Sequence, residues 1–483
     1  MRRFAWSMIF LCLMVTTSAM AQCDPVVTTQ HQIHVGGQTL HYTATTGRIA
    51  IRDAETGNSH GCIFFMAYRV ASPGAVRPLT FLWNGGPGSN SVALHFEAFG
   101  PKRLADGRLV ENASTLLTST DLVFVDPIGT GFSRPAKAKY AQEFYGTLGD
   151  IASITEFVRA WRIQFDALNA PLYLVGESYG GWRAAGVAEA LEKQGQRVTG
   201  IVLISGGAGV GNLTPANVAT ALRIPNRAAT ALFYHRLPAD LGTDRDKLVK
   251  AAMDWATDTY LPALEHCDNL TPNERDKIAD SLARYTGYPA SQVDRATLIV
   301  TPKQYLNGLL RDQGKVLEPL DMRRTTKIEF DHSSAIEPYL RYDLGYHTDL
   351  IYLGLDQSKD EGYVPTPGPR PKSIGERWDY NSAPITPEAI ASAKAGEGPP
   401  GSQPWAIRAL GLNPKMKVLV AAGIYDSYNS CAANDDLLRR INPKIVGNFK
   451  MRCYPGGHMM YLDAGVRRSL SADVAMFIRS TAG

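Results

Sequence analysis

The spacing of hydrophobic positions changes along this chain. Near the N-terminus apolar and polar residues alternate, which is typical of antiparallel strands with one buried face. Residues 32–35 and 38–42 alternate about Gly36-Gly37, and this pattern predicts a hairpin with a two-residue turn. Two further strand-like runs follow, near residues 48–52 and 62–70. We therefore expect the chain to open with an antiparallel meander.

After this opening, short apolar runs alternate with stretches of helical periodicity. Each apolar run has the length of a buried strand; they are residues 79–83, 121–125, 172–175, 198–204, 416–422 and 449–453. Residues 150–165 place Ile151, Ile154 and Phe157 on one helical face, and residues 464–480 predict a closing helix. Buried strands alternating with amphipathic helices predict an α/β fold, with a mixed, mostly parallel sheet flanked by helices.

The alternation stops between residues 211 and 403. The first part is helical in character, as at residues 245–257 and 273–286, and residues 362–403 are rich in Pro, Gly and Ser. Because strands resume afterwards, we expect a large cap-like insertion in one core rather than a linker between independent domains. The core then consists of residues 22–210 and 404–483, and the insertion of residues 211–403.

The first 21 residues have the character of a secretory signal peptide. Arg2 and Arg3 precede a short apolar run at residues 4–15, and the run leads to an A-x-A ending at Ala21. The alternative, an N-terminal membrane anchor, is disfavoured because the run is too short to span a bilayer comfortably. We expect cleavage after Ala21 and an exported protein, periplasmic or extracellular, with no membrane anchor left.

Charge and cysteine content exclude several classes of function. Lys and Arg number 50 against 46 Asp and Glu, a net charge of +4 of which the signal peptide carries two. This near balance gives no basis for a nucleic-acid partner. The chain has no CxxC motif and no Cys/His cluster at metal spacing, so we expect no metal and no cofactor.

Five cysteines remain after signal cleavage. In an oxidising compartment Cys23 with Cys62, and Cys431 with Cys453, are candidate disulfides, although spacing alone leaves the connectivity open. One thiol would be left over.

The strongest candidate for chemistry follows the predicted strand at residues 172–175. This strand runs into Gly176-Glu177-Ser178-Tyr179-Gly180, and a small-residue helical pattern comes next. Strand, G-x-S-x-G and helix form the context of a nucleophile elbow, in which glycines relieve crowding and leave the serine exposed. The five-residue pattern alone is weak evidence, and the alternative is a purely structural glycine turn.

Two further polar residues follow the carboxyl ends of predicted buried strands. Asp426 comes after residues 416–422, and His458 comes after residues 449–453. Ligands of open α/β sheets bind at such strand ends, and the order Ser178, Asp426, His458 is that of the α/β-hydrolases. His458 would take the proton of Ser178, and Asp426 would orient the imidazole. Taken singly, Asp426 could instead cap a helix, and His458 could be a solvated turn residue.

A glycine-rich turn supplies a candidate oxyanion hole. Asn84-Gly85-Gly86-Pro87-Gly88 follows the strand at residues 79–83, and its lack of side chains lets backbone N–H groups approach a tetrahedral oxyanion. The second donor would be the N–H of Tyr179, directly after the nucleophile. The alternative is a plain tight turn.

Four blocks together resemble the signature blocks of the serine carboxypeptidases. They are Trp83-Asn-Gly-Gly-Pro-Gly-Ser-Asn-Ser91, Val125-Asp-Pro-Ile-Gly-Thr-Gly-Phe-Ser133, Gly176-Glu-Ser-Tyr-Gly-Gly181 and Gly456-Gly-His-Met459. They come in that family's order and cover the chain from about residue 79 to its end. The Gly-His-Met-Met ending and the leading antiparallel strands resemble the family's bacterial branch.

The resemblance implies an α/β-hydrolase that removes one C-terminal residue from peptides through an acyl-enzyme. It assigns the triad to Ser178, Asp426 and His458, and the oxyanion hole to the amides of Gly86 and Tyr179. Three further residues match those that hold the terminal carboxylate of the substrate; they are Asn84, Gly85 and Glu177. A glutamate facing a carboxylate must share a proton with it, so binding should weaken as Glu177 ionises. The alternative for Glu177 is a structural carboxylate.

Three departures from the family pattern concern specificity more than the triad. Ala98 stands where the family often has a Glu, and Glu97 lies one place early. Asp426 is the only acid kept from the usual Gly-Asp-x-Asp. Met460-Tyr461 replaces the common Val-Pro.

Two other functions compete with an exported serine carboxypeptidase. An esterase or acyltransferase could use the same scaffold, because fold does not determine function. Glu177 and Asn84 favour the peptidase, since an esterase has no terminal carboxylate to bind. A catalytically silent binding protein is disfavoured by the intact triad. The sequence gives neither the oligomeric state nor the side-chain specificity of the pockets.

Overall fold

The computed structural model describes residues 23–72, 74–211, 214–328, 333–355, 372–381 and 403–482. The predicted signal peptide, and most of the Pro/Gly-rich stretch at 362–403, lie outside these residues. Within the described ranges, no helix has the length and apolar character needed to cross a membrane.

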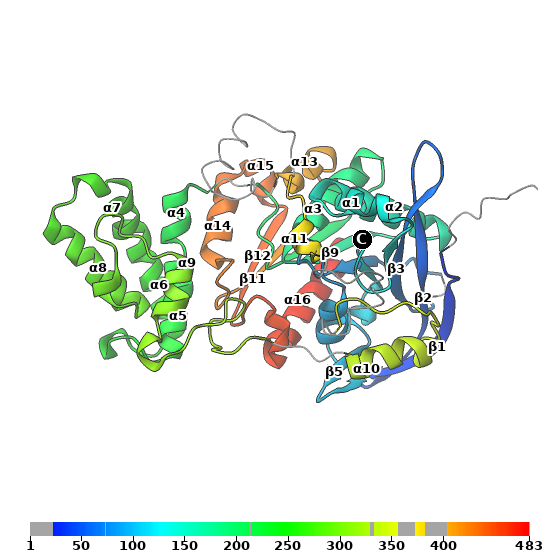
Figure 1. The fold of residues 1–483 in the computed structure, drawn as a ribbon, viewed down its shortest axis with the longest axis horizontal. Helices are drawn as coiled ribbons and strands as arrows, with labels where there is room; N and C mark the ends of the chain where they lie inside the picture. Colours follow the sequence, from blue (N-terminus) through cyan, green and yellow to red (C-terminus); the bar gives the residue numbers. More distant parts are fainter. Residues whose placement is uncertain are drawn as a thin grey trace, which may run out of the picture.

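A ten-stranded mixed sheet forms the centre of the protein (Figure 1). Its main path runs β1, β2, β3, β7, β4, β9, β10, β11, β12, and the short β8 pairs with β3. The strands are β1 (Val27–Val35), β2 (Gln38–Arg52), β3 (Ser59–Arg69), β4 (Leu79–Trp83), β7 (Asp121–Asp126), β8 (Arg134–Pro135), β9 (Leu172–Glu177), β10 (Gly200–Ile204), β11 (Lys417–Gly423) and β12 (Phe449–Tyr454).

The opening strands form the predicted antiparallel meander. β1 and β2 pair about Gly36 and Gly37, whose φ angles of 60° and 77° are those of a two-residue hairpin turn. The sequence suggested two separate strands at residues 38–42 and 48–52, but β2 is one strand across both. Its middle continues because one long strand can pair with β1 on one edge and β3 on the other.

The remaining strands are parallel, and their order is not sequential. β4 lies between β7 and β9, and β10, β11 and β12 follow outward from β9. This mixed sheet, with β9 near its centre and the chain turning sharply from β9 into a helix, is the α/β-hydrolase fold, as the sequence predicted. The carboxyl ends of β4, β9, β11 and β12 all lie at one edge, where the candidate site residues are found.

Helices cover both faces of the sheet. One face packs against α2 (Thr147–Gln164), α3 (Tyr179–Lys193) and α13 (Trp405–Leu412), and the other against α16 (Ala464–Thr481) and residues 336–355. β3 shows why both faces need cover, because its alternate residues contribute to different cores. Phe65 belongs to the first core and Phe64 to the second, and both are fully buried.

The chain segment that connects β10 to β11 forms a helical lobe at one end of the molecule (Figure 1). Its helices are α4 (Ala216–Ala221), α5 (Ile224–Phe233), α6 (Arg245–Trp255), α7 (Leu261–Glu265), α8 (Pro272–Thr286) and α9 (Pro302–Gly308). They share a core of their own that includes Leu248, Tyr260 and Leu282. After the lobe the chain returns to the sheet, where the N–H of Met322 donates to the carbonyl of Tyr425 at 2.9 Å. The limits of the insertion, 211–403, stay a prediction.

The described residues also contain several further strands and α-helices. They are β5 (Lys102–Ala105), β6 (Arg108–Glu111), α1 (Ala141–Phe144), α10 (Ser333–Pro338), α11 (Ile374–Arg377), α14 (Cys431–Arg440) and α15 (Pro443–Val446). A π-helix at Leu94–Phe99 follows the Asn84 turn and was not expected from the sequence.

Both candidate disulfides are present. Cys23 is bonded to Cys62, and Cys431 is bonded to Cys453, with Cα–Cα distances of 5.8 and 5.7 Å. Cys267 keeps a free thiol. The second bond joins the start of α14 to β12, and so holds together the two chain segments that lead away from Asp426 and toward His458.

We predict that replacing Cys431 and Cys453 by Ser lowers the free energy of unfolding by about 3 kcal/mol, because the bond closes a loop of 22 residues. Urea unfolding of the double variant and the parent measures this difference. The matched control is Cys267→Ser, which should change stability by less than about 1 kcal/mol. An unchanged urea midpoint in the double variant would contradict the prediction.

Candidate active site

Ser178 occupies the sharp turn between β9 and α3. Its φ and ψ of 58° and −130° are strained for a residue with a side chain and are those of an exposed elbow serine. The turn closes so tightly that a Cβ on Gly176 would lie 1.8 Å from the carbonyl oxygen of Gly180. The strand–turn–helix context that the sequence predicts for Ser178 is therefore present.

Asp426 and His458 are brought together from the ends of β11 and β12. Asp426 Oδ2 lies 2.7 Å from His458 Nδ1, and both side chains are buried. The other oxygen of Asp426 accepts the N–H of Tyr428 at 2.8 Å. The carboxylate thus fixes the proton on Nδ1 and leaves Nε2 facing the pocket.

The main chain of His458 is held from two sides. Its N–H donates to the carbonyl of Leu320 at 2.6 Å, which comes from the end of the inserted lobe. Its carbonyl accepts the hydroxyl of Ser205, at the end of β10, at 2.7 Å. The imidazole is therefore placed by the sheet and by the insertion together.

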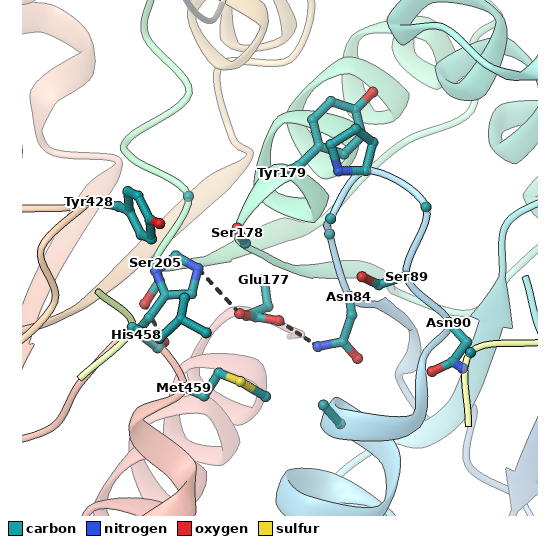
Figure 2. A pocket seen from close by; sticks show the side chains of 18 of the residues that line it. Asn84, Ser89, Asn90, Glu177, Ser178, Tyr179, Ser205, Tyr428, His458 and Met459 are labelled. Atoms are coloured by element: carbon teal, nitrogen blue, oxygen red, sulfur yellow. Dashed lines mark hydrogen bonds and ion pairs between the residues drawn. The ribbon is translucent and has the colours of Figure 1, made fainter. Parts of the chain in front are cut away.

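Glu177 lies between the histidine and the glycine-rich turn (Figure 2). Its Oε1 is 3.5 Å from His458 Nε2, and its Oε2 accepts the side-chain amide of Asn84 at 2.5 Å. Among the hydrogen bonds of the described residues, none joins Ser178 Oγ to the His458 ring. Such bonds are often long in unliganded enzymes and tighten when substrate binds.

Burial and charge shift the two titratable groups that face each other. Burial alone would lower the pKa of His458, but the charge and hydrogen bond of Asp426, with the charge of Glu177, raise it to about 9. Burial raises the pKa of Glu177, although His458 and Asn84 oppose this. Without substrate, the imidazole therefore carries the proton at neutral pH.

The proposed oxyanion donors, Gly86 and Tyr179, line one pocket. Tyr179 is the first residue of α3, so its N–H has no partner within the helix. A Cβ on Gly85 would lie 2.6 Å from that nitrogen, so the glycine turn packs directly on the elbow. Gly86, with φ of 97°, lines the same pocket. Within the described part of the chain, no backbone acceptor is recorded for the N–H of Gly85, Gly86 or Tyr179.

A buried ion pair beneath the elbow was missed from the sequence. Arg183, four residues into α3, donates from Nε to Asp150 Oδ2 at 2.7 Å and from Nη1 to the carbonyl of Asn84 at 2.7 Å. The hydroxyl of Tyr179 donates to the same Asp150 oxygen at 3.1 Å. Asp150 and Arg183 each stand among apolar or small residues in a helical pattern. Because charged residues are rarely buried unless they are paired, this placement could have indicated a buried ion pair.

Tyr461, one of the departures from the family pattern, reaches the site from below. Its fully buried hydroxyl lies 3.5 Å from the side-chain nitrogen of Asn84. The side-chain oxygen of Asn84 accepts a hydrogen bond from the N–H of Leu94 at 2.9 Å, and this bond fixes the orientation of the Asn84 amide. Asn84 therefore presents its amide hydrogens to Glu177 and Tyr461.

Glu177, Ser178, His458 and the glycine turn at residues 84–88 line a pocket of about 1200 Å³ (Figure 2). Apolar and aromatic side chains line it beside the polar ones, among them Trp182, Leu320, Tyr380, Tyr428 and Met459. Nowhere in the described ranges do three or more His, Cys, Asp or Glu gather as they would to hold a metal ion. The arrangement offers a nucleophile, a base, an orienting acid, backbone donors and one further carboxyl group, which together suit acyl transfer.

Comparison with known proteins gives a consistent set of relatives. The serine carboxypeptidase family matches residues 38–295, more than half of the chain. The pheromone-processing carboxypeptidase KEX1 of Arthroderma otae is 35% identical over 156 residues, covering 32% of this chain and 23% of that protein. The retinoid-inducible serine carboxypeptidase of Homo sapiens is 35% identical over 125 residues, covering 25% of this chain and 26% of that protein.

The match to these curated relatives therefore spans about a quarter of their length. Among solved structures, Kex1(delta)p, a prohormone-processing carboxypeptidase from Saccharomyces cerevisiae, aligns over 91% of this chain and 92% of its own. The two are 16% identical, with a TM-score of 0.48.

We predict that the ring of His458 titrates near pH 9. NMR of the ring nitrogens as a function of pH measures this titration. A raised pKa means that the charged pair with Asp426 stabilises the fold fully below the ordinary histidine value of about 6.5. That stabilisation is lost as the pH rises through 9.

Asp426→Asn should lower this pKa most, and Glu177→Gln should lower it less, because Asp426 supplies both charge and hydrogen bond. Ser178→Ala is the matched control and should leave it unchanged. A wild-type midpoint near 6.5, or equal effects of the two acids, would contradict the charged pair between His458 and Asp426.

Proposed function

The chain belongs to the serine carboxypeptidase family, and from this premise we propose that it hydrolyses the C-terminal peptide bond of peptides through Ser178, His458 and Asp426. One observation carries the proposal. A buried carboxyl group, Glu177, lies beside the elbow serine, 3.5 Å from the base, and is hydrogen-bonded by Asn84. In its protonated form this group can donate a hydrogen bond to a free terminal carboxylate, which the substrate of a general esterase lacks.

The chemistry follows from the positions of the groups. Ser178 Oγ attacks the scissile carbonyl carbon while His458 Nε2 takes its proton, and Asp426 stabilises the imidazolium. The N–H groups of Gly86 and Tyr179 stabilise the oxyanion of the tetrahedral intermediate. Collapse releases the C-terminal residue, whose amine takes the proton from His458. Water, activated by the same imidazole, then hydrolyses the acyl-enzyme.

Substrate binding also resolves the protonation of the unliganded site. His458 holds a proton there, and a protonated imidazole cannot act as a base. When the terminal carboxylate of a peptide approaches Glu177, two like charges come together, and one carboxyl group must take up a proton. Glu177 donates the proton that it takes up in a hydrogen bond to the substrate carboxylate, and the loss of its negative charge lowers the pKa of His458, which then gives up its own proton. The base is thereby freed by the substrate it acts on.

Export is part of the same proposal. Two disulfides and a predicted signal peptide suit an oxidising compartment, either the periplasm or the extracellular space. The partners are peptides with a free C-terminal carboxylate, with no metal, cofactor or nucleic acid required.

The decisive assay uses protein beginning at Gln22 with an N-blocked dipeptide and its C-terminal amide, from about pH 4 to 8. We expect the free acid to be cleaved preferentially, with the preference lost as pH rises and Glu177 ionises. Because burial raises the pKa of Glu177, the loss should fall above the ordinary range of a glutamate, about 4.3.

Ser178→Ala is the control and should abolish release of the C-terminal residue. Glu177→Ala should reduce the preference for the free acid about tenfold, as expected for loss of a hydrogen bond to a charged group. Equal turnover of acid and amide in the wild type, or activity on simple esters alone, would favour an esterase instead. Activity surviving in Ser178→Ala would refute the assignment of the nucleophile.

A further inference from the structure

The Asp150–Arg183 ion pair lies under the glycine turn and is sealed from solvent. The exposed fractions of the two side chains are 2% and 0%. They come from α2 and α3, and the guanidinium stacks over the ring of Tyr179 at 5.2 Å. Its Nη1 donates to the carbonyl of Asn84 at 2.7 Å, and its Nη2 has no partner among the described residues.

The contact with Asn84 determines the direction of the next N–H group. The Asn84–Gly85 peptide is trans, and in a planar trans peptide the C=O and the following N–H point in opposite directions. Arg183 draws the carbonyl of Asn84 toward the interior, so the N–H of Gly85 is turned away from Arg183. Gly85 lines the pocket beside Glu177, and its N–H has no recorded backbone acceptor within the described ranges.

We propose that Arg183 and Asp150 are positioning residues that hold the Gly85 N–H toward the pocket, where it binds the terminal carboxylate of the substrate. The inference rests on the proposed function, because it needs a substrate that carries this carboxylate. Neither side chain touches the substrate. Arg183 sets the peptide plane, and Asp150 keeps Arg183 in place while also accepting the Tyr179 hydroxyl.

The energetics of buried ion pairs support a positioning role over a stabilising one. Two charges removed from water lose hydration that their attraction does not reliably return, and apolar residues of similar volume often replace such a pair without loss of stability. The planar guanidinium of Arg183, however, holds the Asp150 carboxylate and the Asn84 carbonyl in defined directions through its N–H groups. An apolar pair cannot do this. Stability and carboxylate recognition should therefore separate in suitable variants.

The test is direct binding, so that it does not depend on turnover. In the Ser178→Ala background, calorimetry gives the dissociation constants of an N-blocked dipeptide and of its C-terminal amide. We expect Asp150→Leu combined with Arg183→Met to keep its melting temperature while the acid-over-amide preference falls tenfold or more, as for a lost hydrogen bond to a charged group. Affinity for the amide should stay within about twofold.

Three further variants separate position from general structural damage. Arg183→Lys keeps the positive charge but loses the planar guanidinium with its several N–H groups. Its acid-over-amide preference should lie between those of the parent and the double variant. Asp150→Asn should also be intermediate, because it keeps the shape and weakens the anchor. The matched control is Arg162→Met, another buried arginine that donates to Gln196 at 2.9 Å from α2. Arg162→Met should lower the melting temperature but leave the acid-over-amide preference unchanged.

Each outcome decides the inference. If the Ser178→Ala parent prefers the acid and the folded pair variants keep that preference, the inference is wrong and the proposed function stands. Equal losses for acid and amide would make the pair a general structural support and also overturn it. If the parent itself binds acid and amide equally, no carboxylate is recognised, and both the inference and the proposed function fail.

Discussion

The site depends on one steric constraint, which is that the ends of β4 and β9 meet with no side chain between them. A Cβ on Gly85 would lie 2.6 Å from the carbonyl oxygen of Glu177, and one on Gly180 would lie 2.8 Å from the carbonyl oxygen of Asn84. This approach lets Trp83 donate from Nε1 to Gly180 at 2.8 Å, which ties the glycine turn to the elbow helix. The elbow serine and the glycine turn, to which the proposed function assigns the nucleophile, the oxyanion donors and the carboxylate-binding groups, are thereby parts of a single packed unit.

Electrostatics then give that unit its chemistry. Asp426 and Glu177 are buried on either side of His458, so the imidazole is held between two acids. Asp426 is hydrogen-bonded to the ring and orients it, whereas Glu177 also faces the pocket and Asn84. In the proposed function, recognition and catalysis are therefore linked, because Glu177 would both bind the substrate carboxylate and control the proton on His458.

Much of this could be read from the sequence, because strand ends and glycine spacing are local properties. The parallel sheet with helices on both faces followed from the buried apolar runs, and the α/β-hydrolase fold from the elbow motif and the family resemblance. The approach of Asp426 to His458 followed from their positions just after two of the predicted strands. What stayed hidden was set by tertiary packing. The neighbouring sequence does not indicate that Arg183 donates to the carbonyl of Asn84, or that the Tyr461 hydroxyl lies next to the Asn84 side chain. The extent of β2 was also missed, because pairing on both edges joins two runs that look separate.

Covalent labelling tests the central claim, that Ser178 is a nucleophile activated by His458, most directly. The protein would be treated with a fluorophosphonate, digested, and examined by mass spectrometry for the modified peptide. We predict a single adduct on Ser178, formed much more slowly in His458→Ala and blocked by a peptide with a free C-terminal carboxylate. An adduct on another serine, or peptide cleavage that persists in fully labelled protein, would contradict it.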